Sequence, residues 1–389
     1  MARLEGRRVA AALFVCAALS VVGVGGAARQ AASPVPKADA GWSVMTSGLD
    51  TNLRGLSVVA PPRGAAGALV IWASGSNGVV LKSIDGGKNW ERIAVPGGED
   101  LDFRGVRAFS SAAAYVMSSG SGDKSKIFKT TDGGATWKMQ FTDTRPAFFL
   151  DAIACDGEMR CVALSDPVDG KFVIVRTTDG ETWQIALSAN MPDAQKDEGA
   201  FAASNSSLAI FRSAKRGDAR SLAFATGGPN GARVFQSPDF GETWTTTETP
   251  LAGGSGAAGI FSLLRLSSNG EFVIVGGDYK NPTNAERTAA ISSDGGKKFA
   301  LASAQPAGYR SSVTSTGGAS LLAAGPGGAD ESEDGGDHWK PVELTGMNVL
   351  ASVPVRGGVE IWAAGAKGTI ERSFKAATAG ANRKRSGVK

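Results

Sequence analysis

A short turn pattern recurs along this chain and limits its possible folds more than any other feature. In its fullest form the pattern is Ser or Thr, any residue, Asp-Gly-Gly, two variable residues and Trp. An Asp side chain can bond backbone N–H groups two residues on, and Gly supplies positive φ, so the pattern predicts a tight hairpin turn whose Trp begins the next strand. We therefore assign a structural role to the six aspartates, which are Asp85, Asp132, Asp179, Asp239, Asp294 and Asp334.

The spacing of the copies predicts the fold. Successive aspartates lie 47, 47, 60, 55 and 40 residues apart, which is the size of a four-stranded propeller blade. A seventh copy is split between the chain ends: residues 361–365 repeat residues 71–75, and Trp42 takes the place of the Trp of the missing turn. We expect an all-β, seven-bladed β-propeller of four-stranded antiparallel blades, with the last blade closed by the N-terminal strand.

The N-terminus predicts export. Arg3, Arg7 and Arg8 precede an uncharged apolar run over residues 9–26, as in a signal peptide. The run is also long enough for an uncleaved membrane anchor, which stays open as the alternative. We expect a periplasmic or secreted protein, with a signal peptide at residues 1–28, a linker at 29–41, the propeller at 42–374 and a disordered basic tail at 375–389.

The formal net charge of +4 lies at the chain ends. Residues 1–41 carry +3 and residues 376–389 carry +4, which leaves −3 on residues 42–375. A protein that binds nucleic acid needs its positive charge on the folded body. This class of function is therefore excluded.

Standard catalytic and metal-binding sets are absent from the sequence. The single histidine, His338, lies inside the sixth turn, which argues against Ser-His-Asp and Cys-His catalysis and against His/Cys metal sites. Residues 254–259 match Gly-x-Gly-x-x-Gly, but no βαβ unit surrounds them, as a dinucleotide site requires. We expect no cofactor, no nucleotide and no metal.

Cys155 and Cys161 bracket a five-residue turn. In an oxidising compartment they can form a disulfide across a hairpin. Two unpaired thiols are the alternative, and the sequence favours neither.

The turn pattern resembles the Asp-box, or BNR repeat, of sialidases and of the Ycf48/Hcf136-like family of photosystem II assembly factors. The resemblance covers residues 42–374, although the third copy lacks one Gly and the fifth has Phe299 in place of Trp. Arg-Gly pairs at residues 54–55 and 104–105 favour the Ycf48-like family, and the Arg-Ile-Pro segment typical of sialidases is missing. The first resemblance implies a binding or assembly role, and the more distant one implies hydrolysis of an acidic sugar.

A ligand site is expected on the face opposite the Asp-bearing turns. Aligning the first strands of the blades places Arg54, Arg104 and Arg310 at equivalent positions, with Asp151 at that position in the third blade. Guanidinium groups bind oxyanions bidentately, so three of them around a funnel suit a carboxylate, sulfate, phosphate or acidic peptide. Alternatively, each Arg pairs with a nearby carboxylate, such as Arg104 with Asp102, and only ties blades together.

Two functions from different classes remain open. One is an exported, monomeric, non-enzymatic binding or assembly factor that holds an acidic or carboxylate-bearing protein on the Arg-lined face, with membrane contact only through an uncleaved signal. The other is a glycoside hydrolase or lyase acting on an acidic glycan, in which two carboxylates, or a tyrosine nucleophile, carry the chemistry. The candidates for that chemistry are Asp102, Asp151, Asp166, Glu198, Asp278, Tyr279 and Tyr309.

Overall fold

A computed structural model describes residues 41–377, apart from 46, 63–64, 187–189, 213–219 and 267–269. The predicted signal peptide, nearly all of the linker and almost the whole basic tail therefore lie outside the described residues. Within the described part, no helix is long and apolar enough to span a bilayer.

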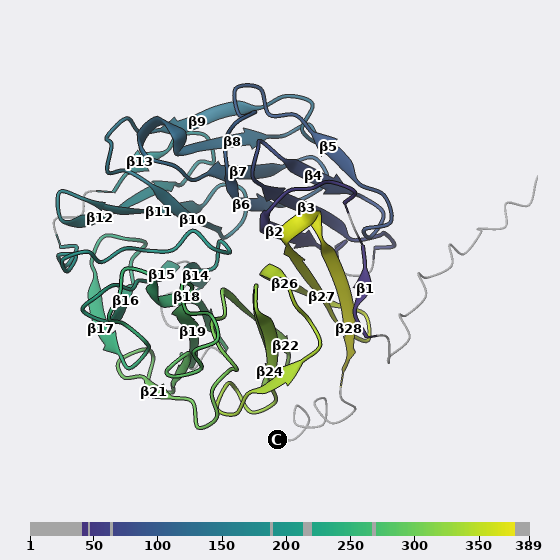
Figure 1. The fold of residues 1–389 in the computed structure, drawn as a ribbon. Coiled ribbons are helices and arrows are strands. Elements are labelled where there is room, and N and C mark those ends of the chain that lie inside the picture. Colours follow the sequence, from purple (N-terminus) through teal and green to yellow (C-terminus); the bar gives the residue numbers. More distant parts are fainter. Residues whose placement is uncertain are drawn as a thin grey trace, which may run out of the picture.

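Seven four-stranded antiparallel sheets are arranged in a ring (Figure 1), which confirms the predicted all-β propeller. Each chain segment enters a blade at its innermost strand and leaves at its outermost one, apart from the last blade. The first three blades consist of β2(Leu53–Val59), β3(Val70–Gly75), β4(Val80–Ser83) and β5(Glu91–Ile93); of β6(Phe103–Ala108), β7(Ala114–Ser118), β8(Lys126–Thr130) and β9(Lys138–Thr142); and of β10(Leu150–Cys155), β11(Cys161–Val168), β12(Lys171–Thr177) and β13(Gln184–Ile185). The next three consist of β14(Leu208–Arg212), β15(Arg220–Ala225), β16(Ala232–Ser237) and β17(Thr245–Thr249); of β18(Ala258–Arg265), β19(Phe272–Asp278), β20(Ala289–Ser292) and β21(Ala300–Leu301); and of β22(Ser312–Gly317), β23(Ser320–Gly325), β24(Gly328–Ser332) and β25(Lys340–Val342). The last blade consists of β26(Met347–Val355), β27(Gly358–Gly365), β28(Ile370–Ala376) and β1(Ser43–Val44).

The two ends of the chain share the last blade. β1 pairs antiparallel with β28, with Ser43 opposite Arg372 and Val44 opposite Glu371, and Figure 1 shows the two strands side by side. The Met45 N–H donates to the Ile370 carbonyl over 2.7 Å. The predicted closure by the N-terminal strand is therefore confirmed, and β28 is not left as an open edge.

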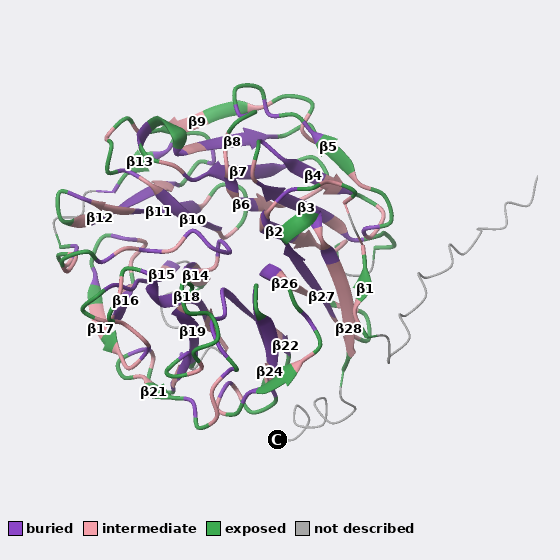
Figure 2. Ribbon diagram, in the orientation of Figure 1, coloured by how far each residue is buried: buried purple, intermediate pink, exposed green. Residues whose placement is uncertain are grey.

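The apolar core is divided into separate clusters, one at each of the seven contacts between neighbouring blades. Trp72 and Val116, for example, belong to the cluster between the first two blades, and Trp362 and Leu53 to the cluster where the last blade meets the first. Figure 2 shows the outermost strands largely exposed and the strands inside them largely buried. Because each blade is packed on both faces, the ring is held by the contacts between sheets.

The innermost strands share a β-bulge near their first residues. In five blades one residue is skipped where the first strand pairs with the second. A bulge redirects the side chain of the extra residue. The five skipped residues are Arg54, Arg104, Asp151, Phe261 and Asn348.

Crowding near the axis explains the glycines that follow two of these residues. A Cβ added to Gly55 would lie 2.2 Å from the Ser74 Oγ, and one added to Gly105 would lie 2.9 Å from the Asn205 Oδ1. The Arg-Gly pairs of the sequence are thus a bulge residue followed by a position that has no room for a side chain.

Candidate functional site

The six Asp-bearing turns have the same hydrogen bonds. In each one the Ser or Thr hydroxyl donates to the Asp Oδ1 and accepts a Gly N–H, all over 2.8–2.9 Å. The same Oδ1 also accepts backbone N–H groups further along the turn. These carboxylates are occupied by their own turns, so none of them is a convincing ligand-binding group.

We expect these turns to make the fold sensitive to acid. The backbone N–H of Asn89 holds the pKa of Asp85 at about 2, and the Thr136 hydroxyl does the same for Asp132, against an ordinary value of 3.8. Since the folded pKa is depressed, the stability from these groups is complete above about pH 4 and is lost as the pH falls towards 2. The free energy of unfolding in urea should fall over this range, less steeply in Asp132→Asn.

A control variant and a difference in pH range separate the effect of the turns from that of other carboxyl groups. Asp123→Asn changes an exposed aspartate outside the six turns and should keep the wild-type slope. Burial raises the pKa of Asp166 to about 6. Its contribution to the free energy of unfolding therefore changes in the opposite direction, and does so between about pH 4 and 6, above the range in which the aspartates of the turns titrate. A wild-type slope in Asp132→Asn would contradict the prediction.

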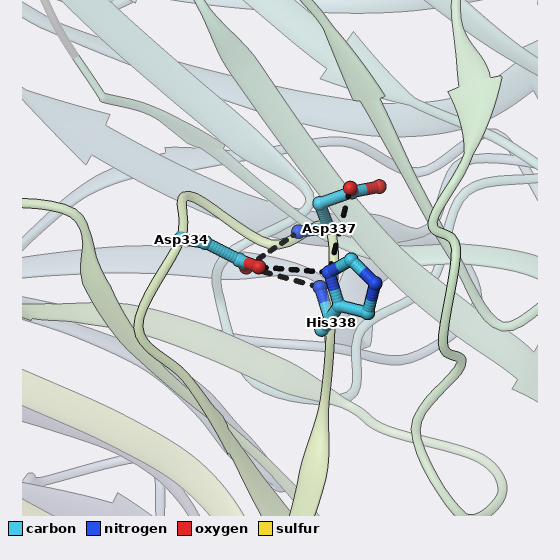
Figure 3. A group of neighbouring side chains, drawn as sticks. All are labelled: Asp334, Asp337 and His338. Carbon is cyan, nitrogen blue, oxygen red and sulfur yellow. Dashed lines mark hydrogen bonds and ion pairs between the residues drawn. The ribbon is translucent and has the colours of Figure 1, made fainter.

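Asp334, Asp337 and His338 lie together in the sixth turn (Figure 3), with possible metal-ligand atoms within 4.8 Å of one another. His338 Nδ1 is 2.8 Å from the Asp334 Oδ2, and the backbone N–H of His338 donates to the Asp334 Oδ1 over 3.0 Å. The contacts drawn in Figure 3 are formed within the turn itself. The cluster is therefore explained as part of the turn.

A cavity of about 1210 Å³ lies where the first strands of several blades begin. All five bulge residues line it, together with Ser311. Antiparallel strands alternate in direction, so the starts of the first strands and the turns after the third strands lie at opposite ends of the blades. The cavity is thus on the face opposite the six Asp-bearing turns, as the sequence predicts.

Arg54 is a basic residue of the cavity wall for which the described residues supply no partner. It is half-buried, and no described residue forms a hydrogen bond or ion pair with its guanidinium group. Burial lowers the pKa of Arg54, and the positive charge of Arg104 lowers it further. Two neighbouring guanidinium groups, one of them unpaired, form a site that an anion would stabilise.

Arg104 is partly neutralised within the protein. Its Nε donates to the Asp102 Oδ2 over 2.7 Å, and its Nη1 donates to the Ala202 carbonyl over 3.4 Å. Both side chains of the Arg104–Asp102 pair remain 28% exposed. The alternative of an Arg paired with a neighbouring carboxylate thus applies to Arg104 but not to Arg54.

Asp151 and Asp166 bring two carboxyl groups into the same cavity. Burial raises the pKa of Asp151 well above its ordinary value, and the charge of Asp166 raises it further, while Arg104 opposes both effects. Burial is also the cause of the raised pKa of Asp166.

An aromatic group forms another wall of the cavity. The rings of Phe201 and Phe261 stack at 3.8 Å, and Tyr309 meets Phe261 edge-on at 4.7 Å. Tyr309 is only 5% exposed, and burial raises its pKa, whereas Tyr279 is 48% exposed. Phe201 and Phe261 could not be predicted from the sequence, because no pattern separates them from ordinary core residues.

The predicted triad of arginines is wrong at Arg310. Gly55 of the first blade pairs with Ser74, and at the corresponding position of the sixth blade Ser312 pairs with Ala324. The residue equivalent to Arg54 is therefore Ser311, which precedes Ser312, and not Arg310. Arg310 is 3% exposed, and its Nε donates to the Asp330 Oδ2 over 2.6 Å inside the blade. It does not line the cavity, and we withdraw it as a ligand-binding residue.

Three candidate carboxylates have structural partners instead. Glu198 accepts hydrogen bonds from the Arg233 Nε over 2.9 Å and from the Thr226 hydroxyl over 2.6 Å, and its side chain is 1% exposed. Asp278 caps a loop through the Lys280 N–H and the Ser255 hydroxyl. Asp278 and Asp102 are not among the lining residues. Of the predicted carboxylates, only Asp151 and Asp166 present carboxyl groups that suit a reaction or a ligand.

Cys155 and Cys161 face each other across β10 and β11 and are joined by a disulfide. The bond lies at the far end of β10 from Asp151, near the first residue of β11, and no part of it lines the cavity.

These features define a seven-bladed β-propeller with a mixed polar and aromatic cavity where the first strands of several blades begin. No family model matches the chain, and no curated protein matches it. Solved structures do match. A structure described as YCF48 bound to D1 peptide has a TM-score of 0.58 at 15% identity and covers 88% of this chain and 100% of that one.

Two other solved structures have similar scores. YCF48 from Cyanidioschyzon merolae has a TM-score of 0.57 at 16% identity over 86% of this chain and 98% of that one. The RRP9 WD40 repeats reach 0.56 at 11% identity over 86% and 97%. The resemblance to Ycf48-like propellers is thereby confirmed for the fold.

Proposed function

We propose that this protein is a non-enzymatic binding propeller that holds a carboxylate-bearing segment of another polypeptide in its cavity. The unpaired guanidinium group of Arg54 is the observation that carries the proposal. A half-buried Arg without a partner is costly, because a charge removed from water normally needs a counter-ion. A bound carboxylate supplies that counter-ion in a bidentate geometry.

The other walls of the cavity also suit a polypeptide. The partly buried ring of Phe201 and the exposed ring of Tyr279 offer apolar surface in the same cavity as Arg54, and a volume of about 1210 Å³ exceeds what a single carboxylate needs. A YCF48 structure of the same fold is described as bound to a D1 peptide, which supports a peptide as the class of ligand for this chain.

A binding measurement tests the proposal. Fluorescein-labelled hexaglutamate should bind the wild-type protein in a fluorescence anisotropy titration, and hexaglutamine should not. Arg54→Gln should weaken the binding of hexaglutamate about 10-fold or more, because a hydrogen bond to a charged group contributes about 1.5–3 kcal/mol.

Arg92→Gln provides the matched control. Arg92 is exposed on β5, away from the cavity, so its loss removes the same charge without touching the site. If Arg54→Gln and Arg92→Gln weaken binding equally, the effect comes from net charge and the proposed site is wrong.

We also propose that the protein acts as a monomer outside the cytoplasm, in the periplasm or as a secreted protein. The apolar segment within residues 1–28 supports export. The disulfide between Cys155 and Cys161 supports an oxidising compartment.

A glycoside hydrolase or lyase is the second candidate, since Asp151 and Asp166 share one cavity with raised pKa values. Such values suit a general acid. Methylumbelliferyl sialoside and glucuronide test it: turnover that is lost in Asp166→Asn would establish the enzyme, and we expect no turnover of either compound by the wild-type protein.

A further inference from the structure

We propose that the carboxyl groups of Asp151 and Asp166 form a second subsite of the cavity, which binds a primary ammonium group of the bound polypeptide. The inference rests on the proposed function and deepens it, because it gives the ligand an amine as well as a carboxylate. Lysine side chains and free N-termini carry this group.

Asp151 supplies the first observation. The residue is 1% exposed and lines the cavity, and its Oδ2 is buried without a hydrogen-bond partner among the described residues. Buried carboxyl oxygens are nearly always hydrogen-bonded in folded proteins. A donor that enters the cavity would satisfy this oxygen.

Asp166 places a second carboxyl group beside the first. Its Oδ1 accepts the Ala200 N–H over 2.9 Å, and a Cβ on Gly199 would lie 3.0 Å from the same atom. Within the described part of the chain, no residue donates a hydrogen bond to the Oδ2 of Asp166. Leu150 pairs with Ser165, so Asp151 and Asp166 each follow a residue of one cross-strand pair, and both line the same cavity. The charge of Asp166 also raises the pKa of Asp151, as expected for neighbouring carboxyl groups.

Within the described part of the chain, no basic residue of the cavity forms an ion pair with Asp151 or Asp166. Arg104 is bonded to Asp102 and to the Ala202 carbonyl, and Arg54 forms no ion pair in the described part of the chain. Lys196 lines the cavity but is exposed and forms no ion pair among the described residues. An external cation therefore competes with Lys196, with the charge of Arg104 that acts on Asp151, and with water.

An ammonium group fits the pair better than a metal ion. It carries three N–H donors, which suit two or three oxygens, whereas Ca²⁺ takes six to eight oxygen ligands. Among the described residues, the only group of three metal-ligand side chains is in the sixth turn, on the opposite face. The pair offers two carboxyl groups and no third.

Two matched peptides test the subsite: fluorescein-labelled Glu-Glu-Gly-Gly-Lys amide and the same peptide with an acetylated lysine. The unmodified peptide should bind the wild-type protein about 10-fold more tightly. The difference should shrink to less than twofold in Asp166→Asn and Asp151→Asn, and should persist in Lys196→Met and in Asp278→Asn. Asp166→Asn keeps the acceptor for the Ala200 N–H, so it tests the site even if Asp151→Asn fails to fold.

The pH dependence provides a second readout. The charged groups around the pair are Arg54, Arg104 with its partner Asp102, Lys196, Asp197, and Glu198 with its partner Arg233. Because burial raises the pKa of Asp166 to about 6, the preference for the unmodified peptide should increase from pH 5 to 7.5 and should be flat in Asp166→Asn.

The possible failures are distinguishable. If Arg54→Gln weakens both peptides while acetylation changes nothing in the wild-type protein, the ammonium subsite is overturned and the proposed function stands. If neither peptide binds, both proposals are wrong. If millimolar Ca²⁺ abolishes the preference at constant ionic strength, the carboxyl pair is a metal site and the ammonium proposal is wrong.

Discussion

Asp330→Ala should reduce the free energy of unfolding by about 3–5 kcal/mol, as expected when one partner of a buried ion pair is removed. The side chains of Arg310 and Asp330 are 4% and 0% exposed, so the variant would leave an uncompensated guanidinium group inside the sixth blade. The Ala307 N–H, which also donates to the Asp330 Oδ1 over 3.2 Å, would lose its acceptor. Unfolding in guanidinium chloride, followed by tryptophan fluorescence, measures the loss.

Asp193→Ala is the control for an exposed pair. Asp193 and Lys171 are 83% and 41% exposed, and such pairs contribute about 0–1 kcal/mol. If the two variants were equally stable, the Arg310–Asp330 pair would not stabilise the sixth blade, and Arg310 would again be a candidate ligand-binding residue.

Trp362→Ala should destabilise the protein by a similar amount, about 3–5 kcal/mol, because it leaves a large cavity in the core. Trp362 is 0% exposed and belongs to the apolar cluster where the last blade meets the first. Its ring reaches the first turn, where a Cβ on Gly87 would lie 2.5 Å from the Trp362 Cη2. Removal of this ring would weaken the contact between the last and the first blade, which closes the ring of blades. Unfolding in guanidinium chloride measures the resulting fall in the free energy of unfolding.

Trp362→Phe separates packing from polarity. The Trp362 Nε1 is buried and has no hydrogen-bond partner among the described residues, so the side chain contributes through its apolar surface. The Phe variant should therefore keep more than half of the stability that the Ala variant loses. Equal losses in the two variants would show that the indole N–H forms a hydrogen bond that stabilises the fold.

The fold could be predicted because its information is local and repeated. Each turn is specified by a Ser or Thr hydroxyl, an Asp carboxylate and a Gly N–H within a few residues, and such bonds need no knowledge of the rest of the chain. The closure of the ring followed from the repeat as well, because Trp42 and residues 361–365 are two parts of one copy.

The site could be predicted only in part, because its information is neither local nor repeated. Arg54, Asp151 and Asp166 were placed correctly in the cavity. Arg310 was misplaced by one residue, because the alignment matched arginine with arginine, whereas the pairing of Ser312 with Ala324 makes Ser311 the equivalent position. Glu198 finds its partner Arg233 only through the folded arrangement of the fourth blade and the segment before it.

The pairing of β1 with β28 has a consequence for how the protein is made. Of the strands that the structure describes, β1 is translated first, and its hydrogen-bonding partner β28 is translated last. A nascent chain must therefore keep its first strand unpaired until almost the whole polypeptide has left the ribosome. A product truncated shortly before Ile370 would lose its last hairpin and also the docking edge for its own beginning, so premature termination at one end disables both.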